Sequence, residues 1–401
     1  MTPSFDPWRA AAGLVLFGSL LAAGVCTSVL AVGLSLSAPV PAVLGSPPAE
    51  LPGAEAVRIP SASGSVLRGW WVPGRPGGGA VVLLHGVRSN RLSLVRRARV
   101  LHEHGFAVLL LDLQAHGEST GRRITFGRLE ALDAAAAVAF VRERLPGERV
   151  GAIGVSLGGA AALLGPAPLP VDALVLESVY PDIGAALAHR LRAALGPVAG
   201  TVFTPVLVPA FEALLPPVLG VRPDALRPAD RIGAATAPVL VASGTADDRT
   251  PLAEARRLFD RAPEPKRFWA VPGAGHVDLE RHDPDAYRCV VLSFLARYLR
   301  HPASGVPDAT PPGDTTPGGT TPGDGAGGRA RGRAAAPRVR VATGTGRRGH
   351  GPVATGAARG HCRAATWRDG ARAWDETGER RTAACCSACC SCAPPPACCS
   401  R

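Results

Sequence analysis

A serine with a glycine two residues before it and another two residues after it is the clearest chemical signal in the sequence. Ser156 lies in Gly154-Val155-Ser156-Leu157-Gly158, directly after an apolar stretch at residues 150–155 and before the helix-forming residues 157–164. A nucleophilic serine on a sharp strand-to-helix turn needs small neighbours, because its backbone is strained and its hydroxyl must project freely. Such a pattern can also reflect close packing alone, but the strand-turn-helix setting favours a nucleophile.

A serine hydroxyl needs a base to become a nucleophile near neutral pH, and the base needs a carboxylate to orient it. Asp247 and His276 each follow a predicted strand, and they come after Ser156 in the order serine, acid, histidine. We therefore predict a catalytic triad of Ser156, Asp247 and His276. Two other acids stay open for the middle role: Asp248 is adjacent to Asp247, and Glu177 ends an earlier strand.

The tetrahedral intermediate of acyl transfer carries an oxyanion, which needs preorganised backbone N–H donors. We predict one donor at Leu157, the residue after the nucleophile, and a second at Val87, in the loop after the predicted strand 80–84. His85 and His116 stand in neighbouring motif loops but precede the nucleophile. We expect structural or surface roles for both.

Apolar runs bounded by turn residues alternate with helical patterns across residues 50–300, which predicts βαβ units and a mostly parallel sheet of about eight strands. The predicted strands are residues 56–59, 66–72, 80–84, 107–111, 150–155, 173–176, 238–243 and 267–271. The predicted helices are residues 92–104, 126–145, 157–164, 252–261 and 284–298. Functional residues of such sheets gather at the carboxyl ends of the strands, which is where the candidate residues lie.

Five segments together resemble the α/β-hydrolase superfamily, and more narrowly its serine aminopeptidase and monoacylglycerol-lipase-like branch. They are Leu84-His85-Gly86, residues 112–119, the segment around Ser156, residues 244–251 and Gly275-His276. The resemblance implies an α/β-hydrolase fold with a Ser-His-Asp triad, and it is much less specific for the substrate. Residues 112–119 depart from the family's frequent D-x-R-G-H-G-x-S pattern at Gln114 and Ala115.

An apolar insert punctuated by prolines follows at residues 180–231. In the family it resembles, an insert at this point commonly forms a small helical cap over the site. An apolar cap suits an acyl chain or another apolar small molecule. The same residues could instead pack onto the core or lie on a bilayer.

Residues 10–38 contain no charged side chain. A bilayer core needs roughly 20 apolar residues in a helix, whereas the apolar region of a signal peptide is shorter, about 7 to 15 residues. We therefore predict that residues 1–45 form an uncleaved transmembrane anchor and a short linker. Arg9 precedes the span, so the positive-inside rule places the catalytic domain outside the cytoplasm. Secretion after signal cleavage following Ala42 is the alternative.

Residues 301–401 are rich in Gly, Pro, Thr, Ala and Arg, which predicts a low-complexity, disordered tail. The tail holds 14 Arg against 7 acidic residues, so it contributes +7 to the net charge of +12 and leaves +5 for the rest of the chain. We expect no nucleic-acid partner from that balance. Its cysteines lack the paired spacing of a zinc module, so we expect no metal there.

Taken together, these features predict an α/β-hydrolase domain at residues 50–300 with a cap at about 180–231. We expect a serine hydrolase that cleaves a carboxylic ester, thioester or amide of an apolar acyl substrate and uses no cofactor. A catalytically inactive scaffold of the same fold, which binds partners at the membrane, is the alternative.

Overall fold

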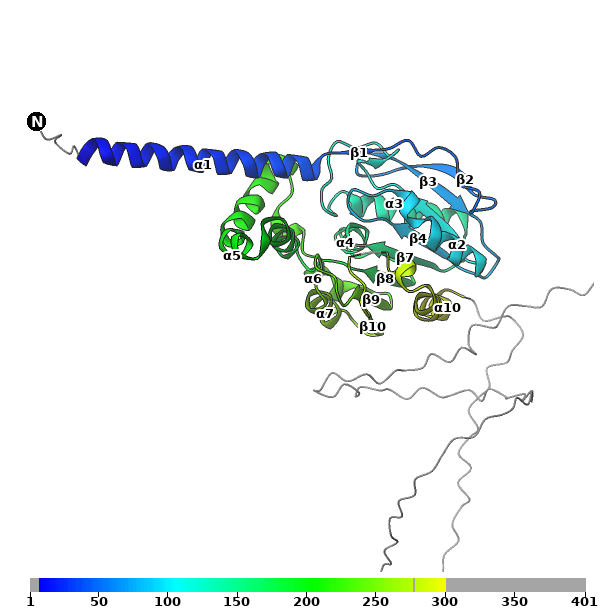
Figure 1. Cartoon of the computed structure of the whole chain (residues 1–401). Helices are drawn as coiled ribbons and strands as arrows, with labels where there is room; N and C mark the ends of the chain where they lie inside the picture. Colours follow the sequence, from blue (N-terminus) through cyan, green and yellow to red (C-terminus); the bar gives the residue numbers. More distant parts are fainter. Residues whose placement is uncertain (1–6, 277, 301–401) are drawn as a thin grey trace, which may run out of the picture. The chain divides into compact units, whose positions relative to one another are not determined.

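One large sheet positions the candidate residues (Figure 1). It has eight strands. The computed structural model of the chain describes residues 7–276 and 278–300, and the strands follow one another in space as β10-β9-β8-β7-β4-β5-β3-β2. From β5 to β10 all neighbours run parallel, whereas β3 pairs antiparallel with both β5 and β2. The predicted mostly parallel sheet is therefore confirmed. The strands are β2 (Glu55–Pro60), β3 (Val66–Val72), β4 (Ala80–Leu84), β5 (Ala107–Leu111), β7 (Val150–Val155), β8 (Ala173–Glu177), β9 (Val239–Gly244) and β10 (Lys266–Val271).

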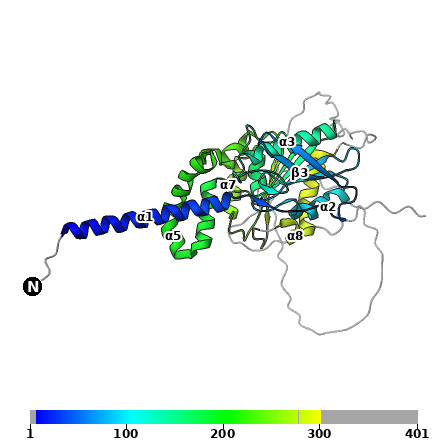
Figure 2. The same ribbon diagram turned by 90° about the horizontal axis from the view of Figure 1, so that it is seen from above.

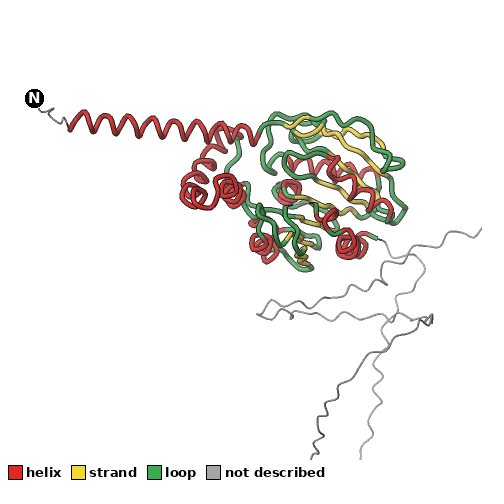
Figure 3. Tube along the Cα trace, viewed as in Figure 1, coloured by secondary structure: helices red, strands yellow, loops and turns green. Residues whose placement is uncertain are grey.

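Helices cover both faces of the sheet, which explains why β4 and β5 are apolar and buried at every position (Figure 3). Successive side chains of a strand point to opposite faces, so Val82 of β4 enters one core cluster and Val81 enters the other. The first cluster includes α3 (Glu130–Arg144), α4 (Leu157–Leu163) and α7 (Leu252–Arg261), and the second includes α2 (Val95–Glu103), α8 (Leu279–His282), α9 (Pro284–Tyr287) and α10 (Ser293–Leu299).

Three predicted helices differ from the structure, two in where they begin and one in its continuity. The helix expected at 92–104 begins with a 3₁₀ turn, Arg91–Leu94, because the Asn90 side chain accepts a hydrogen bond from the N–H of Leu92. The helix expected from residue 126 begins only at Glu130, because Phe126 adopts a left-handed φ of 52°. The helix expected at 284–298 is interrupted by a π-helical turn at Arg288–Leu292.

The predicted cap region contains one long helix that folds back on itself. This helix, α5 (Ile183–Leu219), is interrupted at Gly196, which has a φ of 79° and is followed by a proline. A Cβ atom on Gly200 would lie 2.8 Å from the Cα of Arg192. Residues eight apart in a straight helix are separated by about 12 Å, so α5 forms a hairpin whose tip is at Gly196. Two 3₁₀ turns (Pro223–Ala225 and Ile232–Ala234) and α6 (Pro228–Arg231) lead back to the sheet.

An N-terminal helix, α1 (Pro7–Ser37), extends away from the sheet, and its C-terminal end packs against α5 (Figure 2). A Cβ atom on Gly33 would lie 3.8 Å from the Phe211 ring of α5. The chain then forms a short strand, β1 (Val40–Pro41), which pairs in parallel with β6 (His116–Gly117). Among the described residues, α5 is the one helix long and apolar enough to cross a membrane, with a mean hydropathy of 1.7, but its hairpin shape turns it back on itself. The predicted tail and its cysteine cluster lie outside the described residues.

Candidate active site

Ser156 occupies a strained turn between β7 and α4. Its φ of 49° and ψ of −107° lie in a region that residues with a side chain rarely adopt. The glycines around it permit the turn: a Cβ atom on Gly154 would lie 2.5 Å from the Cα of Gly159, and one on Gly158 would lie 2.3 Å from the carbonyl oxygen of Leu84. The turn therefore depends on close backbone packing that only glycine permits, and Ser156 itself is largely buried, with 5% of its surface exposed.

The loops after β9 and β10 bring Asp247 and His276 together. The Nδ1 atom of His276 lies 3.0 Å from Oδ2 and 3.1 Å from Oδ1 of Asp247. The backbone N–H groups of Arg249 and Thr250 donate to Oδ1 of the same carboxylate, at 3.0 and 2.8 Å. Burial opposes ionisation of Asp247, but hydrogen bonding and charge from His276 outweigh it, so the pKa of this carboxyl lies below its usual value. The carboxylate is therefore held in an orientation that fixes the imidazole.

Ser156 and His276 line the same pocket, whose volume is about 200 Å³. Within the described residues, no hydrogen bond joins the Ser156 hydroxyl to the His276 ring. Hydrogen bonds between catalytic groups are often long or poorly aligned before substrate binds. The lack of a hydrogen bond between Ser156 and His276 in the described residues is therefore compatible with a nucleophile and its base. The pocket wall combines apolar with polar side chains: Gly86, Val87, Ser89, Ser93, Leu94, Arg97, Val155, Ser178, Arg249 and Asp278 complete it.

The two other acids considered for the triad are placed elsewhere. Glu177 is buried, and its carboxylate accepts hydrogen bonds from Arg97 at 2.6 Å and from the Tyr287 hydroxyl at 2.7 Å. Asp248 is exposed and, within the described part of the chain, makes no polar contact with His276. Of the three acids, Asp247 alone contacts the imidazole among the described residues.

The loop after β4 faces the serine turn. A Cβ atom on Gly86 would lie 3.7 Å from the Cβ of Ser156. The N–H groups of Val87 and Leu157 donate no hydrogen bond to any described residue. Leu157 is the first residue of α4, where helical N–H groups have no partner within the helix. Val87 lines the pocket and Leu157 directly follows Ser156, and neither N–H group has a hydrogen-bond partner among the described residues.

The rings of His85 and His116 are held by hydrogen bonds to residues of this loop, so they are not placed to act as bases. The Nδ1 atom of His85 donates to the Gly86 carbonyl at 2.8 Å, and its Nε2 accepts from the Leu113 N–H at 3.0 Å. Burial, followed by repulsion from His116, lowers the pKa of His85 to about 3. The Nε2 atom of His116 accepts from the Arg88 N–H at 3.1 Å. Sequence reasoning predicted structural or surface roles for both rings but not the contact with Arg88.

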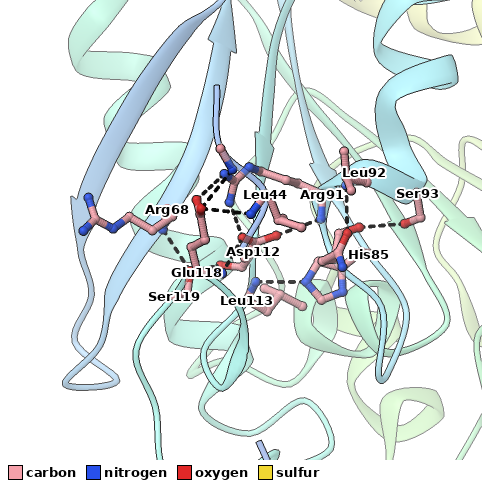
Figure 4. Close-up of polar contacts among 12 residues, drawn as sticks. Leu44, Arg68, His85, Arg91, Leu92, Ser93, Asp112, Leu113, Glu118 and Ser119 are labelled. Carbon is pink, nitrogen blue, oxygen red and sulfur yellow. Dashed lines mark hydrogen bonds and ion pairs between the residues drawn. The ribbon is translucent and has the colours of Figure 1, made fainter. Parts of the chain in front are cut away.

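A buried ion cluster beside His85 was also missing from the sequence-based prediction (Figure 4). Arg91 donates to the carboxylates of both Asp112 and Glu118. Asp112 also accepts from the backbone N–H groups of Arg91 and Glu118, at 2.8 and 3.0 Å. The segment 112–119 was recognised as a motif, but no local pattern identifies its arginine partner.

Metal ligands were not expected, and the described residues contain no group of three or more His, Cys, Asp or Glu side chains arranged to hold a metal ion. The cysteine-rich segment lies outside those residues. The described site therefore offers a serine, an imidazole, a carboxylate and two free backbone donors as its chemical groups.

Comparisons with known proteins show the family and the fold of the chain. Residues 76–217 match the family model described as serine aminopeptidase, S33. An uncharacterized protein of Mycobacterium tuberculosis is 33% identical over 261 residues, which cover 63% of this chain and 82% of that protein. The uncharacterized protein YqkD of Bacillus subtilis is 25% identical over 241 residues, covering 59% and 77%. An esterase of Pyrococcus furiosus, 24% identical, superposes with a TM-score of 0.54 over 66% of this chain and 98% of its own. That structural likeness shows a shared fold.

Proposed function

Because the chain belongs to the serine aminopeptidase (S33) family of α/β hydrolases, we propose that it cleaves a carboxylic ester, thioester or amide with Ser156 as nucleophile. The observation that carries the proposal is the pairing of His276 with Asp247 at the rim of the pocket that Ser156 also lines. The strained serine turn and the two unused N–H groups support the same chemistry.

In the first half of the reaction, His276 takes the proton of Ser156 as the hydroxyl attacks the acyl carbon. Asp247 holds the imidazole by its Nδ1–H and stabilises the imidazolium that forms. The N–H groups of Val87 and Leu157 donate to the oxyanion of the tetrahedral intermediate. Loss of one such donor typically costs about 10²- to 10³-fold in rate.

In the second half, the imidazolium protonates the leaving group and an acyl-serine remains. Water then attacks the acyl carbon while His276 accepts its proton, and the imidazolium returns that proton to the Ser156 oxygen as its bond to the acyl carbon breaks and the acid product leaves. All of these proton transfers pass through one imidazole, and each needs the orientation that Asp247 provides. No resident metal or organic cofactor is part of the proposal.

Labelling with a fluorophosphonate probe tests the enzyme proposal directly. The probe should modify the wild-type chain and leave Ser156→Ala unmodified. Equal reaction of both proteins would reject the proposal and favour an inactive binding scaffold.

We further propose that the substrate carries an apolar acyl group. The support for this part of the proposal is the apolar composition of α5, the helix in the predicted cap region. A panel of p-nitrophenyl esters of increasing chain length, together with aminoacyl amides, tests it. We expect turnover to rise with acyl length, and a preference for small aminoacyl amides would overturn this part alone.

We also propose that α1 anchors the protein in a membrane with the catalytic domain outside the cytoplasm. The helix is about 46 Å long, at 1.5 Å per residue, and a bilayer core is about 30 Å thick. Its consecutive residues 14–17 are apolar and 62–73% exposed, so the helix is apolar on every side rather than along one stripe. The hydroxyls of Ser19, Thr27 and Ser28 donate to carbonyls four residues earlier, so their donor groups are satisfied within the helix.

The hairpin tip of α5 supports the same location. Large apolar side chains near the tip are 40–77% exposed: Leu195, Val198, Val202, Phe203 and Val206. Exposed apolar surface of this extent is uncommon on monomers that remain in water. The C-terminal end of α1 packs against α5 at Phe211, and we propose that the bilayer around α1 also takes up this tip.

A further inference from the structure

The chain between α1 and the catalytic domain is bonded to the domain at several points, so it is not a free tether. We call residues 35–45 the linker segment. The Ser37 carbonyl accepts from the Ile124 N–H at 2.8 Å. The Val40 N–H donates to the Ala115 carbonyl at 2.8 Å as part of the pairing between β1 and β6. A segment with this many backbone partners is part of the folded domain.

One of these contacts reaches the loop that carries a proposed oxyanion donor. The guanidinium of Arg88 donates through Nη1 to the carbonyl of Ser35, at 3.1 Å, near the end of α1. Arg88 directly follows Val87, and its φ of 57° is left-handed. Such a conformation costs of order 1–3 kcal/mol and persists only where surrounding contacts hold it.

His116 also contacts this turn. The residue that pairs with His116 between β1 and β6 lies in the linker segment as well. The backbone N–H of Arg88 donates to Nε2 of His116, and Val40 of β1 pairs with His116 of β6. Arg88 is thus connected to the linker segment twice: directly through its guanidinium, and indirectly through the imidazole of His116.

The far end of the linker segment is bound to the ion cluster beneath the loop (Figure 4). Glu118 accepts from the N–H groups of Leu44 and Gly45, each at 3.0 Å, and pairs with Arg91. The hydrogen bond from Arg91 lowers the pKa of the Glu118 carboxyl to about 2 against the opposing effect of burial. Glu118 is therefore ionised at neutral pH. Its carboxylate accepts hydrogen bonds both from the linker segment and from Arg91 of the ion cluster.

We propose that the linker segment and Arg88 position the oxyanion loop, so that turnover depends on the end of α1 being seated against the domain. This inference rests on the proposed serine hydrolase function. Arg88 and Glu118 touch no reacting atom, and they act through the direction of the Val87 N–H. Cleavage after Ala42 would detach residues 35–42 from the domain, and with them the contacts made by Ser35, Ser37 and Val40, so it would impair catalysis as well as release the protein.

The test uses the full chain in detergent and compares Arg88→Gln with the wild type. We expect kcat to fall about tenfold, less than the 10²- to 10³-fold typical of losing a donor outright, because the Val87 N–H is misdirected rather than removed. KM should stay within about twofold, and the rate of fluorophosphonate labelling should fall by the same factor as kcat. Arg88→Lys, which can still reach the Ser35 carbonyl, should recover part of the loss.

Arg231→Gln is the matched control. Arg231 donates to the backbone carbonyls of Gly165 and Pro166, at 3.0 and 2.7 Å, without contacting the candidate site. It should match the wild type in kcat and labelling. Glu118→Gln provides a second variant in case Arg88→Gln does not fold, and it should also lower kcat without raising KM.

Wild-type kcat and labelling rates in both Arg88→Gln and Glu118→Gln would overturn the positioning role. An equal loss of activity in Arg231→Gln would overturn it as well, because the effect would then follow general destabilisation. Either result leaves the enzyme proposal standing as long as Ser156→Ala abolishes labelling. Labelling that survives in Ser156→Ala is the separate outcome that removes the enzyme proposal itself.

Discussion

The Nδ1 atom of His276 lies 3.0 Å from Oδ2 of Asp247, across the gap between the loops that follow β10 and β9. The two loops are held close by backbone contacts, since the N–H of Ala246 donates to the carbonyl of Ala274 at 2.9 Å. A side chain on Gly244 would lie 2.1 Å from that same carbonyl oxygen. The imidazole and its carboxylate are therefore aligned by the neighbouring parallel strands before any substrate binds.

The adjacent acids Asp247 and Asp248 provide a direct test of this pairing. Asp247→Asn should lower kcat by about 10³- to 10⁴-fold, because the amide no longer holds the imidazole in the tautomer that accepts the serine proton. Asp248→Asn is the control, since Asp248 is exposed, and its kcat should stay close to the wild type. Ester hydrolysis at saturating substrate measures both, and similar losses in the two variants would contradict the assignment of Asp247.

The glycine before the nucleophile should not tolerate a side chain. Gly154→Ala would place its Cβ 2.5 Å from the Cα of Gly159, a backbone atom that cannot rotate away. Overpacking of this kind costs about 1–3 kcal/mol, and we expect a lower thermal midpoint together with loss of fluorophosphonate labelling. Gly233→Ala is the control, because its Cβ would meet only the Arg261 carbonyl at 3.4 Å. A fully active Gly154→Ala protein would show that the turn is not as tightly packed as described.

Buried His85 should make the protein less stable in mild acid. Its pKa is about 3 in the folded chain against 6.5 in the unfolded chain, so between these values the unfolded state binds more protons and stability falls as pH decreases. From pH 7 to pH 5 this contributes about 2 kcal/mol. Thermal unfolding at the two pH values should show a smaller acid-induced drop for His85→Gln than for the wild type. The exposed His282→Gln should keep the wild-type drop, and an unchanged drop in His85→Gln would refute this origin.

The anchoring role of α1 predicts a charge-sensitive association with membranes. Leu16→Arg combined with Leu20→Arg should release the protein from membranes during alkaline extraction, because each charge at the centre of a span costs about 2.5–3.5 kcal/mol. Leu92→Arg, at a position 48% exposed on the catalytic domain, should remain in the membrane fraction. Mass spectrometry of the mature wild-type chain should find residues 1–42 still present. A mature chain that begins after Ala42 would indicate a secreted protein instead.

Local patterns were sufficient for the strands and the serine turn. The bounds of β3, β4, β5 and β7 agree with the predicted ones, because each strand is bounded on at least one side by a glycine, a proline or a charged residue: Pro73, Gly79, Asp112 and Arg149. The start of α3 was mispredicted, since the apolar periodicity continues through Phe126 although the backbone there turns left-handed. Apolar spacing reports which residues are buried, but it does not report where a backbone dihedral changes sign.

The sequence by itself determined the fold class, the turn at Ser156 and the order of serine, acid and histidine, because these depend on residue type and short-range spacing. Only the tertiary structure separated Asp247 from Glu177 as the partner of His276. Glu177 bonds to Arg97 and Tyr287, which lie 80 and 110 residues away in the chain. The contact between Arg88 and Ser35 spans 53 residues in the same way. A hydrogen bond depends on distances in space, and contacts between distant segments exist only once the sheet has brought those segments together.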